Sequence, residues 1–189
     1  MDPDTTEIQN SYLASKPFVL FYYLIQCDVK FLRPAQPGQF PWLVSVTRDG
    51  RHVCSGVILT SRHVLTAATS VQAPGVIGVT IREHHLTQAD PGQTGRDVTQ
   101  IQTHPEFRLS EPPEHNLAVL TLDQRLEFSV SEPELAPVCW GPLSPLTSQD
   151  TQDTDHVYTS WGLTQFGPAA VPHWTRLPVV DRDTCQVTI

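Results

Sequence analysis

The chain has 189 residues, which is enough for one domain or two small ones with a substantial core. It carries 12 basic and 20 acidic residues for a net charge of −8, and a charged fraction of only 17% argues against an intrinsically disordered chain. With 17 prolines and a single methionine, a helical bundle or a coiled coil is disfavoured. Residues 123–189 are the most acidic part, and no segment has a basic patch, so we expect no nucleic-acid partner.

An apolar stretch, Phe18 to Ile25, lies near the N-terminus. It is too short to cross a bilayer, which takes about 20 apolar residues, so a membrane partner is not expected. Its length suits the apolar part of a secretory signal, although acidic residues precede it and no small-residue cleavage site follows. Residues 1–28 therefore form an N-terminal segment with two open interpretations, an atypical signal or an N-terminal strand or tail.

The next part of the chain alternates apolar and polar side chains, as is typical of half-buried strands. Asp49-Gly50 indicates a two-residue hairpin turn, because both turn positions favour a positive φ. The pattern predicts six strands, at residues 42–47, 51–59, 63–67, 75–83, 96–103 and 116–122. Six short strands joined by turns with Gly, Pro or Asp indicate a closed antiparallel barrel.

The pattern changes after Leu122. Residues 123–139 are typical of an extended connector, and residues 141–155 form a polar loop. Two more strands are predicted at residues 156–161 and 175–180. Asp181 then stands where an N-cap would begin a short helix.

Eight motifs in chain order resemble the trypsin/chymotrypsin family of serine proteases. Among them, TAATS at residues 66–70 resembles the family's TAAHC, and NLAVL at residues 116–120 resembles its DIALL. The others lie at residues 35–46, 53–59, 104–107, 137–139, 160–162 and 180–185. The resemblance implies an all-β, trypsin-like double antiparallel β-barrel. We expect the first barrel, residues 29–122, to be complete and the second, within residues 123–189, to be truncated.

The same resemblance locates the catalytic positions. Peptide hydrolysis in this family needs a serine nucleophile, a histidine base and an aspartate that fixes the tautomer of the histidine. The position of the histidine holds Thr69, whose hydroxyl cannot accept a proton near neutral pH, and the position of the aspartate holds Asn116, a neutral amide. No GDSGG-like motif supplies the serine. Family members are activated by cleavage after a basic residue, and residues 29–32, which match the new N-terminus, follow Asp28 instead. We therefore predict no catalytic residue. No cofactor is predicted either, and no metal, because no CxxC or Cys/His spacing supports a metal site.

The cysteines are Cys27, Cys54, Cys139 and Cys185. The family's partner for Cys54 is replaced by Ser70, and the partner for Cys185 would follow the last residue of the chain. The resemblance implies one disulfide, between Cys27 and Cys139. The alternatives are buried free thiols and, for Cys185, a bridge to another chain.

Several other residues have both a functional and a structural interpretation. His84-His85 suggests a metal site, but adjacent residues of a strand point to opposite faces, so none is predicted. We expect His63 to be a structural histidine with its hydrogen bonds satisfied. Trp42 and Trp161 are expected in the core.

The leading hypothesis is a catalytically inactive protease homologue that acts as a protein-binding or decoy module. Its candidate partner surface is the apolar edge of the unfinished second barrel, formed by Val157, Tyr158, Trp161, Leu177, Val179 and Val180. A partner protein or a second copy of the chain would cover this edge. Two alternatives are endopeptidase activity confined to a longer form of the chain, and a truncated product without a stable function. The resemblance implies a secreted protein.

Overall fold

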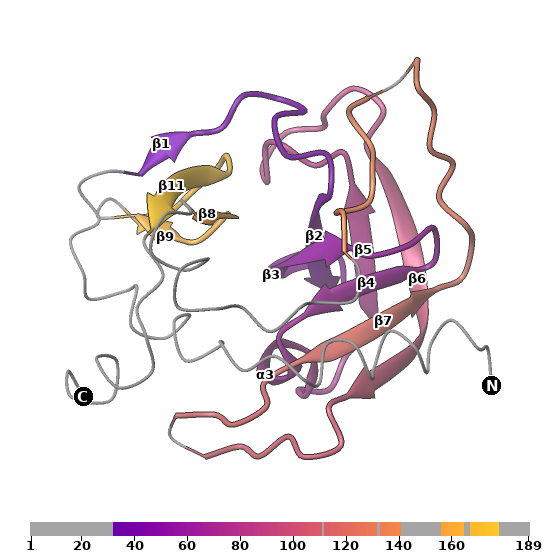
Figure 1. Cartoon of the computed structure of the whole chain (residues 1–189), viewed down its shortest axis with the longest axis vertical. Coiled ribbons are helices and arrows are strands. Elements are labelled where there is room, and N and C mark those ends of the chain that lie inside the picture. The colour runs from indigo at the N-terminus through magenta and orange to yellow at the C-terminus, as the bar shows by residue number, and fades with distance from the viewer. Residues whose placement is uncertain (1–31, 111, 132, 141–155, 165–166, 178–189) are drawn as a thin grey trace.

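A computed structural model describes residues 32–110, 112–131, 133–140, 156–164 and 167–177 (Figure 1). These residues form strands and one short helix, α3 (Ala68–Val71). No helix among them is long and apolar enough to span a membrane. The strands make a closed barrel and a smaller separate sheet, so the predicted all-β class is confirmed.

The barrel is closed in the order β2-β3-β4-β7-β6-β5. Its strands are β2 (Leu43–Arg48), β3 (Arg51–Ile58), β4 (His63–Thr66), β5 (Ile77–Ile81), β6 (Thr94–Thr103) and β7 (Ala118–Leu122). The predicted hairpin turn joins β2 to β3, with φ of 51° at Asp49 and 75° at Gly50. The strand predicted at residues 75–83 is shorter than expected because Gly75 and Arg82, with φ of 136° and 56°, leave the extended conformation at its two ends.

Apolar side chains fill the interior of the barrel. Val44 and Val46 of β2 point inward, as alternation along a strand requires, and both are fully buried. Gly56 lies opposite Val44 on β3, where a Cβ atom would come within 2.8 Å of the Val64 side chain. The interior is therefore packed closely enough that this position has no room for a side chain.

The smaller sheet has the order β1-β11-β8 and joins β1 (Arg33–Pro34), β8 (His156–Ser160) and β11 (His173–Leu177). Two short strands, β9 (Leu163–Thr164) and β10 (Gly167–Pro168), pair separately. The strand predicted at residues 175–180 begins earlier, at residue 173, where it pairs with Ser160. Residues 178–183, with the candidate N-cap Asp181, lie outside the described part.

The strand β1 belongs to the smaller sheet, although residues 29–122 were expected to form the first barrel. Two contacts hold it there. The guanidinium carbon of Arg33 lies 5.9 Å from the centroid of the Trp174 ring, and the backbone N–H of Ala35 donates to the carbonyl of Pro172 at 2.8 Å. The N-terminal part of the described chain therefore ties the two sheets to one another.

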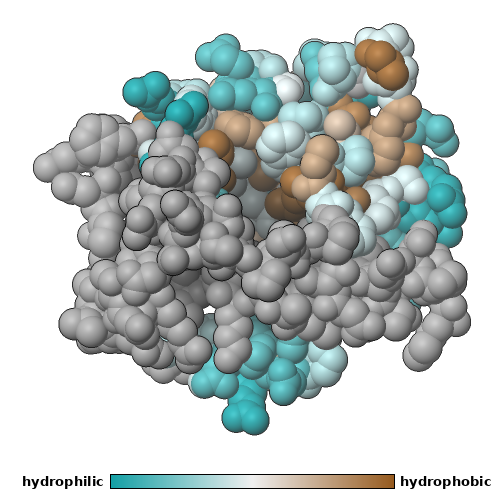
Figure 2. All heavy atoms as spheres, viewed as in Figure 1, coloured by the Kyte–Doolittle hydropathy of each residue, from teal (hydrophilic) through white to brown (hydrophobic). Residues whose placement is uncertain are grey.

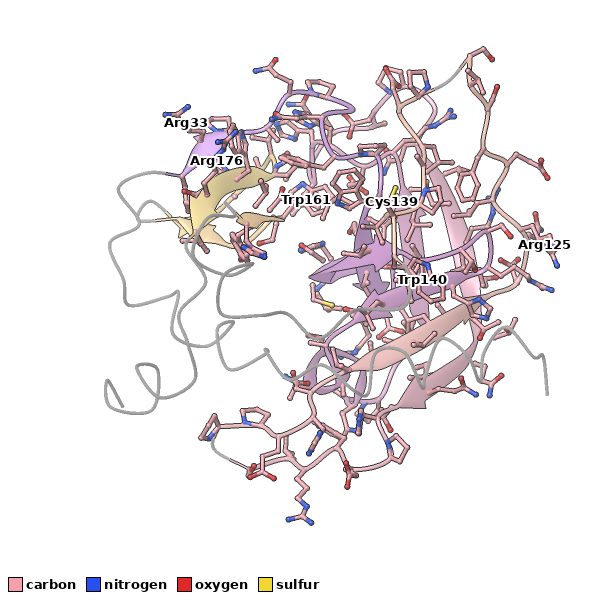
Figure 3. The ribbon with its side chains drawn as sticks, in the orientation of Figure 1. Arg33, Arg125, Cys139, Trp140, Trp161 and Arg176 are labelled. Carbon is pink, nitrogen blue, oxygen red and sulfur yellow. The ribbon has the colours of Figure 1, made fainter. Side chains whose placement is uncertain are left out.

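Trp161 connects the smaller sheet to the barrel (Figure 3). Its indole Nε1–H donates to the carbonyl of His84 at 2.9 Å, and its ring packs edge-on against His52 at 5.6 Å. The side chain is only 4% exposed, so its expected place in the core is confirmed. Its inclusion in the partner surface is wrong, because the barrel already covers this ring.

Trp42 is half-buried and packs against the barrel core, as expected.

The connector after β7 covers part of the outside of the barrel. The Trp140 Nε1–H donates to the carbonyl of Leu59 at 2.8 Å, and the N–H of Val138 donates to Ile58 at 2.9 Å. Leu59 and Val119 form a small outer apolar cluster with these side chains. Figure 2 shows apolar side chains gathered on this face, with hydrophilic ones around the upper and right-hand rim.

Candidate functional site

The barrel strands bring Thr69 and Asn116 together. Strands β4 and β7 are paired, with Thr66 opposite Ala118. Thr69 lies in α3, directly after β4, and Asn116 lies two residues before β7. Two positions far apart in the sequence therefore meet at the same end of the barrel.

A reciprocal pair of hydrogen bonds joins the two residues. The backbone N–H of Thr69 donates to Oδ1 of Asn116 at 2.9 Å, and Nδ2 of Asn116 donates to Oγ1 of Thr69 at 3.1 Å. Both residues are half-buried. Because neither a hydroxyl nor an amide titrates near neutral pH, this pair cannot take a proton from a nucleophile and return it to a leaving group.

The Cys54 thiol lies beside this pair. Its sulfur is 3.1 Å from Oγ1 of Thr66, and it also interacts with Ser70 in α3, the residue that replaces the family's disulfide partner for Cys54. Burial raises the pKa of Cys54, and the hydrogen bonds from Thr66 and Ser70 offset this only in part. The sulfur therefore stays a neutral thiol near pH 7, which is a poor nucleophile.

The other described cysteine is Cys139, which is exposed. Cys54 and Cys139 are not bonded to each other. Cys27 and Cys185 lie outside the described residues, so the disulfide between Cys27 and Cys139 stays a prediction.

Ser45 and His52 form a serine–histidine contact that sequence reasoning missed. Oγ of Ser45 lies 2.8 Å from Nδ1 of His52, a distance that suits a nucleophile and its base. Ser45 is fully buried, however, so no peptide can reach its hydroxyl. The Asp49-Gly50 hairpin was the available signal, because it folds the strand that holds Ser45 back against the strand that holds His52. The pair is a structural link beneath Trp161.

A pH effect follows from the position of His52. Burial lowers the pKa of His52 below its ordinary value near 6.5, so the unfolded chain binds more protons than the folded chain as the pH falls. We expect this contribution to stability to be complete above pH 6.5 and to be lost as the pH falls through the lowered pKa. Urea unfolding from pH 7.5 to pH 5 should therefore show a smaller loss of stability in His52→Gln than in the wild type. Equal losses in the two proteins would contradict this assignment.

The histidines considered as metal ligands or structural residues have distinct surroundings. His84 and His85 follow β5 in a loop rather than in a strand, and their backbone N–H groups both donate to Oδ2 of Asp90, at 2.6 and 2.7 Å. That they hold no metal stays a prediction. His63 is buried, with its Nδ1 2.8 Å from Oγ1 of Thr60, so its expected structural role is confirmed.

The remaining residues of the candidate partner surface differ in exposure, and two of them lie outside the described residues. Val157 on β8 is 50% exposed, whereas Tyr158 and Leu177 are half-buried. Strand β11 pairs with β8 along its length and with β1 at His173 and Trp174. Val179 and Val180 lie outside the described residues. In the described part of the chain, β8 pairs with β11 alone.

Known proteins resemble most of the chain. The family described as Trypsin matches residues 30–188. Coagulation factor IX of Cavia porcellus is 30% identical over 155 residues, which cover 80% of this chain and 53% of that protein. The proclotting enzyme of Tachypleus tridentatus is 31% identical over 170 residues, covering 82% and 44% of the two chains. Ovochymase-2 of Mus musculus is 32% identical over 107 residues, or 55% of this chain and 17% of its own length. This chain therefore matches about half, or less, of each relative.

Proposed function

The chain belongs to the trypsin family, and we propose that it is a member that does not cut peptides but binds another protein. The observation that carries the proposal is the hydrogen-bonded pair of Thr69 and Asn116. These residues occupy the positions that match the family's histidine base and its aspartate partner. The mechanism of the family depends on both groups, since exchanging the aspartate for asparagine alone lowers turnover about 10⁴-fold.

The nearby nucleophiles that could replace the lost machinery do not suit that role. The Cys54 thiol is neutral, because burial raises its pKa. The Ser45 hydroxyl has a histidine partner but is fully buried. Both observations support a domain that retains the barrel of the family without its chemistry.

The binding surface that we propose is the part of β8 around Val157, where an exposed apolar side chain would contact a partner protein. Burial of such a side chain against a partner favours association. Val157 supplies that side chain, with half of its surface exposed. A second copy of this chain is the simplest partner to test. The resemblance to a largely secreted family supports a place in the secretory pathway.

One preparation of the full chain tests both parts of the proposal. With trypsin as the positive control, we expect no turnover of a fluorogenic peptide library and no labelling by a fluorophosphonate probe. In light scattering, we expect an average mass that rises with concentration and that falls back to the monomer in Val157→Lys, because a charge at this position disfavours its burial against a partner.

The matched control is Val130→Lys, which places the same charge on a fully exposed valine of the connector and should associate like the wild type. Reproducible peptide turnover would overturn the inactive assignment. A monodisperse monomer that binds no hydrophobic dye would overturn the binding assignment.

A further inference from the structure

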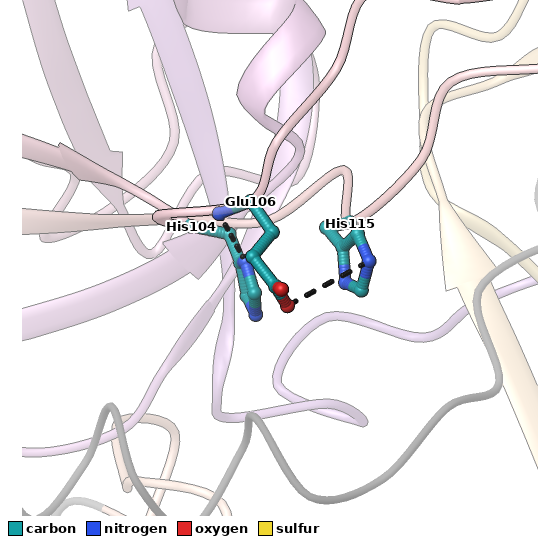
Figure 4. Close-up of polar contacts among 3 residues, drawn as sticks. All are labelled: His104, Glu106 and His115. Atoms are coloured by element: carbon teal, nitrogen blue, oxygen red, sulfur yellow. Dashed lines mark hydrogen bonds and ion pairs between the residues drawn. The ribbon is translucent and has the colours of Figure 1, made fainter.

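The loop between β6 and β7 brings together three side chains that commonly ligate metals, His104, Glu106 and His115 (Figure 4). His104 directly follows β6, and His115 lies three residues before β7. The two strands are paired at this end, with Thr103 opposite Ala118. The barrel therefore fixes the two ends of the loop, and the histidines lie near these adjacent ends.

Further contacts hold the loop closed. The backbones of Arg108 and Glu114 exchange two hydrogen bonds, at 3.0 and 3.1 Å. The N–H of His104 donates to the carbonyl of Leu117 at 2.9 Å, and Phe107 packs against the barrel core. The three side chains are thus displayed from a closed hairpin anchored in the fold.

One potential ligand atom from each side chain lies within 4.8 Å of the other two. Nε2 of His115 is 3.9 Å from Oε2 of Glu106, and the rings of His104 and His115 stack with centroids 4.7 Å apart and an angle of 22° between their planes. Figure 4 shows the contact between the Glu106 carboxylate and the His115 ring. All three groups therefore lie around one small volume.

We propose that His104, Glu106 and His115 form a binding site for Zn²⁺. Two imidazoles and a carboxylate form a donor set that zinc accepts, with water completing a tetrahedron. Bonds of about 2.0–2.2 Å place tetrahedral ligands roughly 3.3–3.6 Å apart, so ligand atoms now up to 4.8 Å apart must close by as much as about 1.5 Å. The carboxylate can make this movement, since 72% of the Glu106 side chain is exposed. The stacked rings must also turn until their nitrogen lone pairs point to one ion.

Binding requires one local exchange at His104. Nδ1 of this ring accepts a hydrogen bond from the backbone N–H of Glu106 at 3.0 Å, so the neutral ring carries its proton on Nε2. Zinc takes an unprotonated nitrogen, and His104 therefore gives up this hydrogen bond when it ligates the ion. The exchange weakens the site without blocking it, because one neutral hydrogen bond is replaced by a metal–nitrogen bond.

Zinc titration of the full chain after treatment with a chelator tests this site. With calorimetry, or with competition against a chromophoric chelator, we expect saturable binding of Zn²⁺. His104→Gln, Glu106→Gln and His115→Asn should each weaken the affinity at least tenfold, since even an outer-shell partner of a metal ligand is typically worth 10–100-fold. The matched control is His156→Gln, which removes an exposed histidine of β8 and should bind zinc like the wild type.

Two further readouts keep the test decisive. Glu106→Gln exchanges an exposed side chain for one of the same shape, so circular dichroism should confirm that its fold is intact. In nuclear magnetic resonance spectra, the ring signals of His104 and His115 should shift together as Zn²⁺ is added, while those of His63 stay fixed. The proposal is overturned if no saturable binding occurs, or if the three variants bind zinc as tightly as the wild type. Neither outcome bears on the proposed lack of proteolysis.

Discussion

Replacing Trp161 with alanine is expected to lower the free energy of unfolding by about 3–5 kcal/mol. The indole is almost fully enclosed between the smaller sheet and the barrel. Alanine would leave a cavity against His52 and would remove the donor that pairs with the carbonyl of His84. Urea unfolding followed by far-ultraviolet circular dichroism measures the change without relying on the fluorescence of the deleted side chain.

The matched variant is Trp161→Phe, which keeps an aromatic ring in the same space but has no N–H group. Its loss should be smaller than that of the alanine variant, and should reflect a smaller ring and an unpaired carbonyl at His84. Trp161→Ala could also unfold in two steps, with the smaller sheet separating first, and a second probe on the barrel would detect this. A loss below about 1 kcal/mol, in the range of ordinary surface substitutions, would show that this contact does not join the two sheets.

Replacing Leu120 with alanine is expected to destabilise the fold by about 2–5 kcal/mol. Leu120 is fully buried at the centre of β7, which lies between β4 and β6 in the barrel. Deleting its side chain opens a cavity that the surrounding strands cannot close, because each is hydrogen-bonded to its neighbours on both sides. The unfolding midpoint in urea, with an unchanged slope, reports the loss.

Leu109→Ala provides the control for this substitution. The Leu109 side chain is 74% exposed in the loop between β6 and β7, so its truncation should change stability by no more than about 0.5 kcal/mol. Similar losses in the two variants would contradict the assignment of Leu120 to the core.

Much of the barrel could be predicted from the sequence because its strands and its first turn are specified by local sequence patterns. Alternation along each strand marks the inward side chains, and Asp49-Gly50 supplies the positive φ values that a tight hairpin needs. Ends of strands were less accurate where a single residue leaves the extended conformation, as Arg82 does after β5. The pairing of β1 with β11 could not be predicted, because a strand of two residues has no detectable period.

The candidate sites also divide into residues that local motifs predict and contacts that depend on the tertiary fold. The family motifs identified Thr69 and Asn116, and the pairing of β4 with β7 explains why they meet. Trp161 was expected both in the core and on a partner surface, and only the position of the barrel decides between the two. His104 and His115 are separated in sequence by a loop, so their stacking depends on a strand register that no short motif encodes.

The order of strands in the barrel has a consequence for its synthesis. The last barrel strand in the sequence, β7, lies between β4 and β6, and the barrel is closed elsewhere by the pairing of β2 with β5. While the chain grows from its N-terminus, β4 and β6 therefore each present an unpaired edge until residues 118–122 have left the ribosome. A nascent chain that pauses before residues 118–122 are released exposes two unpaired strand edges and the apolar side chains of the barrel interior. We therefore expect such a paused chain to be more prone to aggregation than one that has released β7.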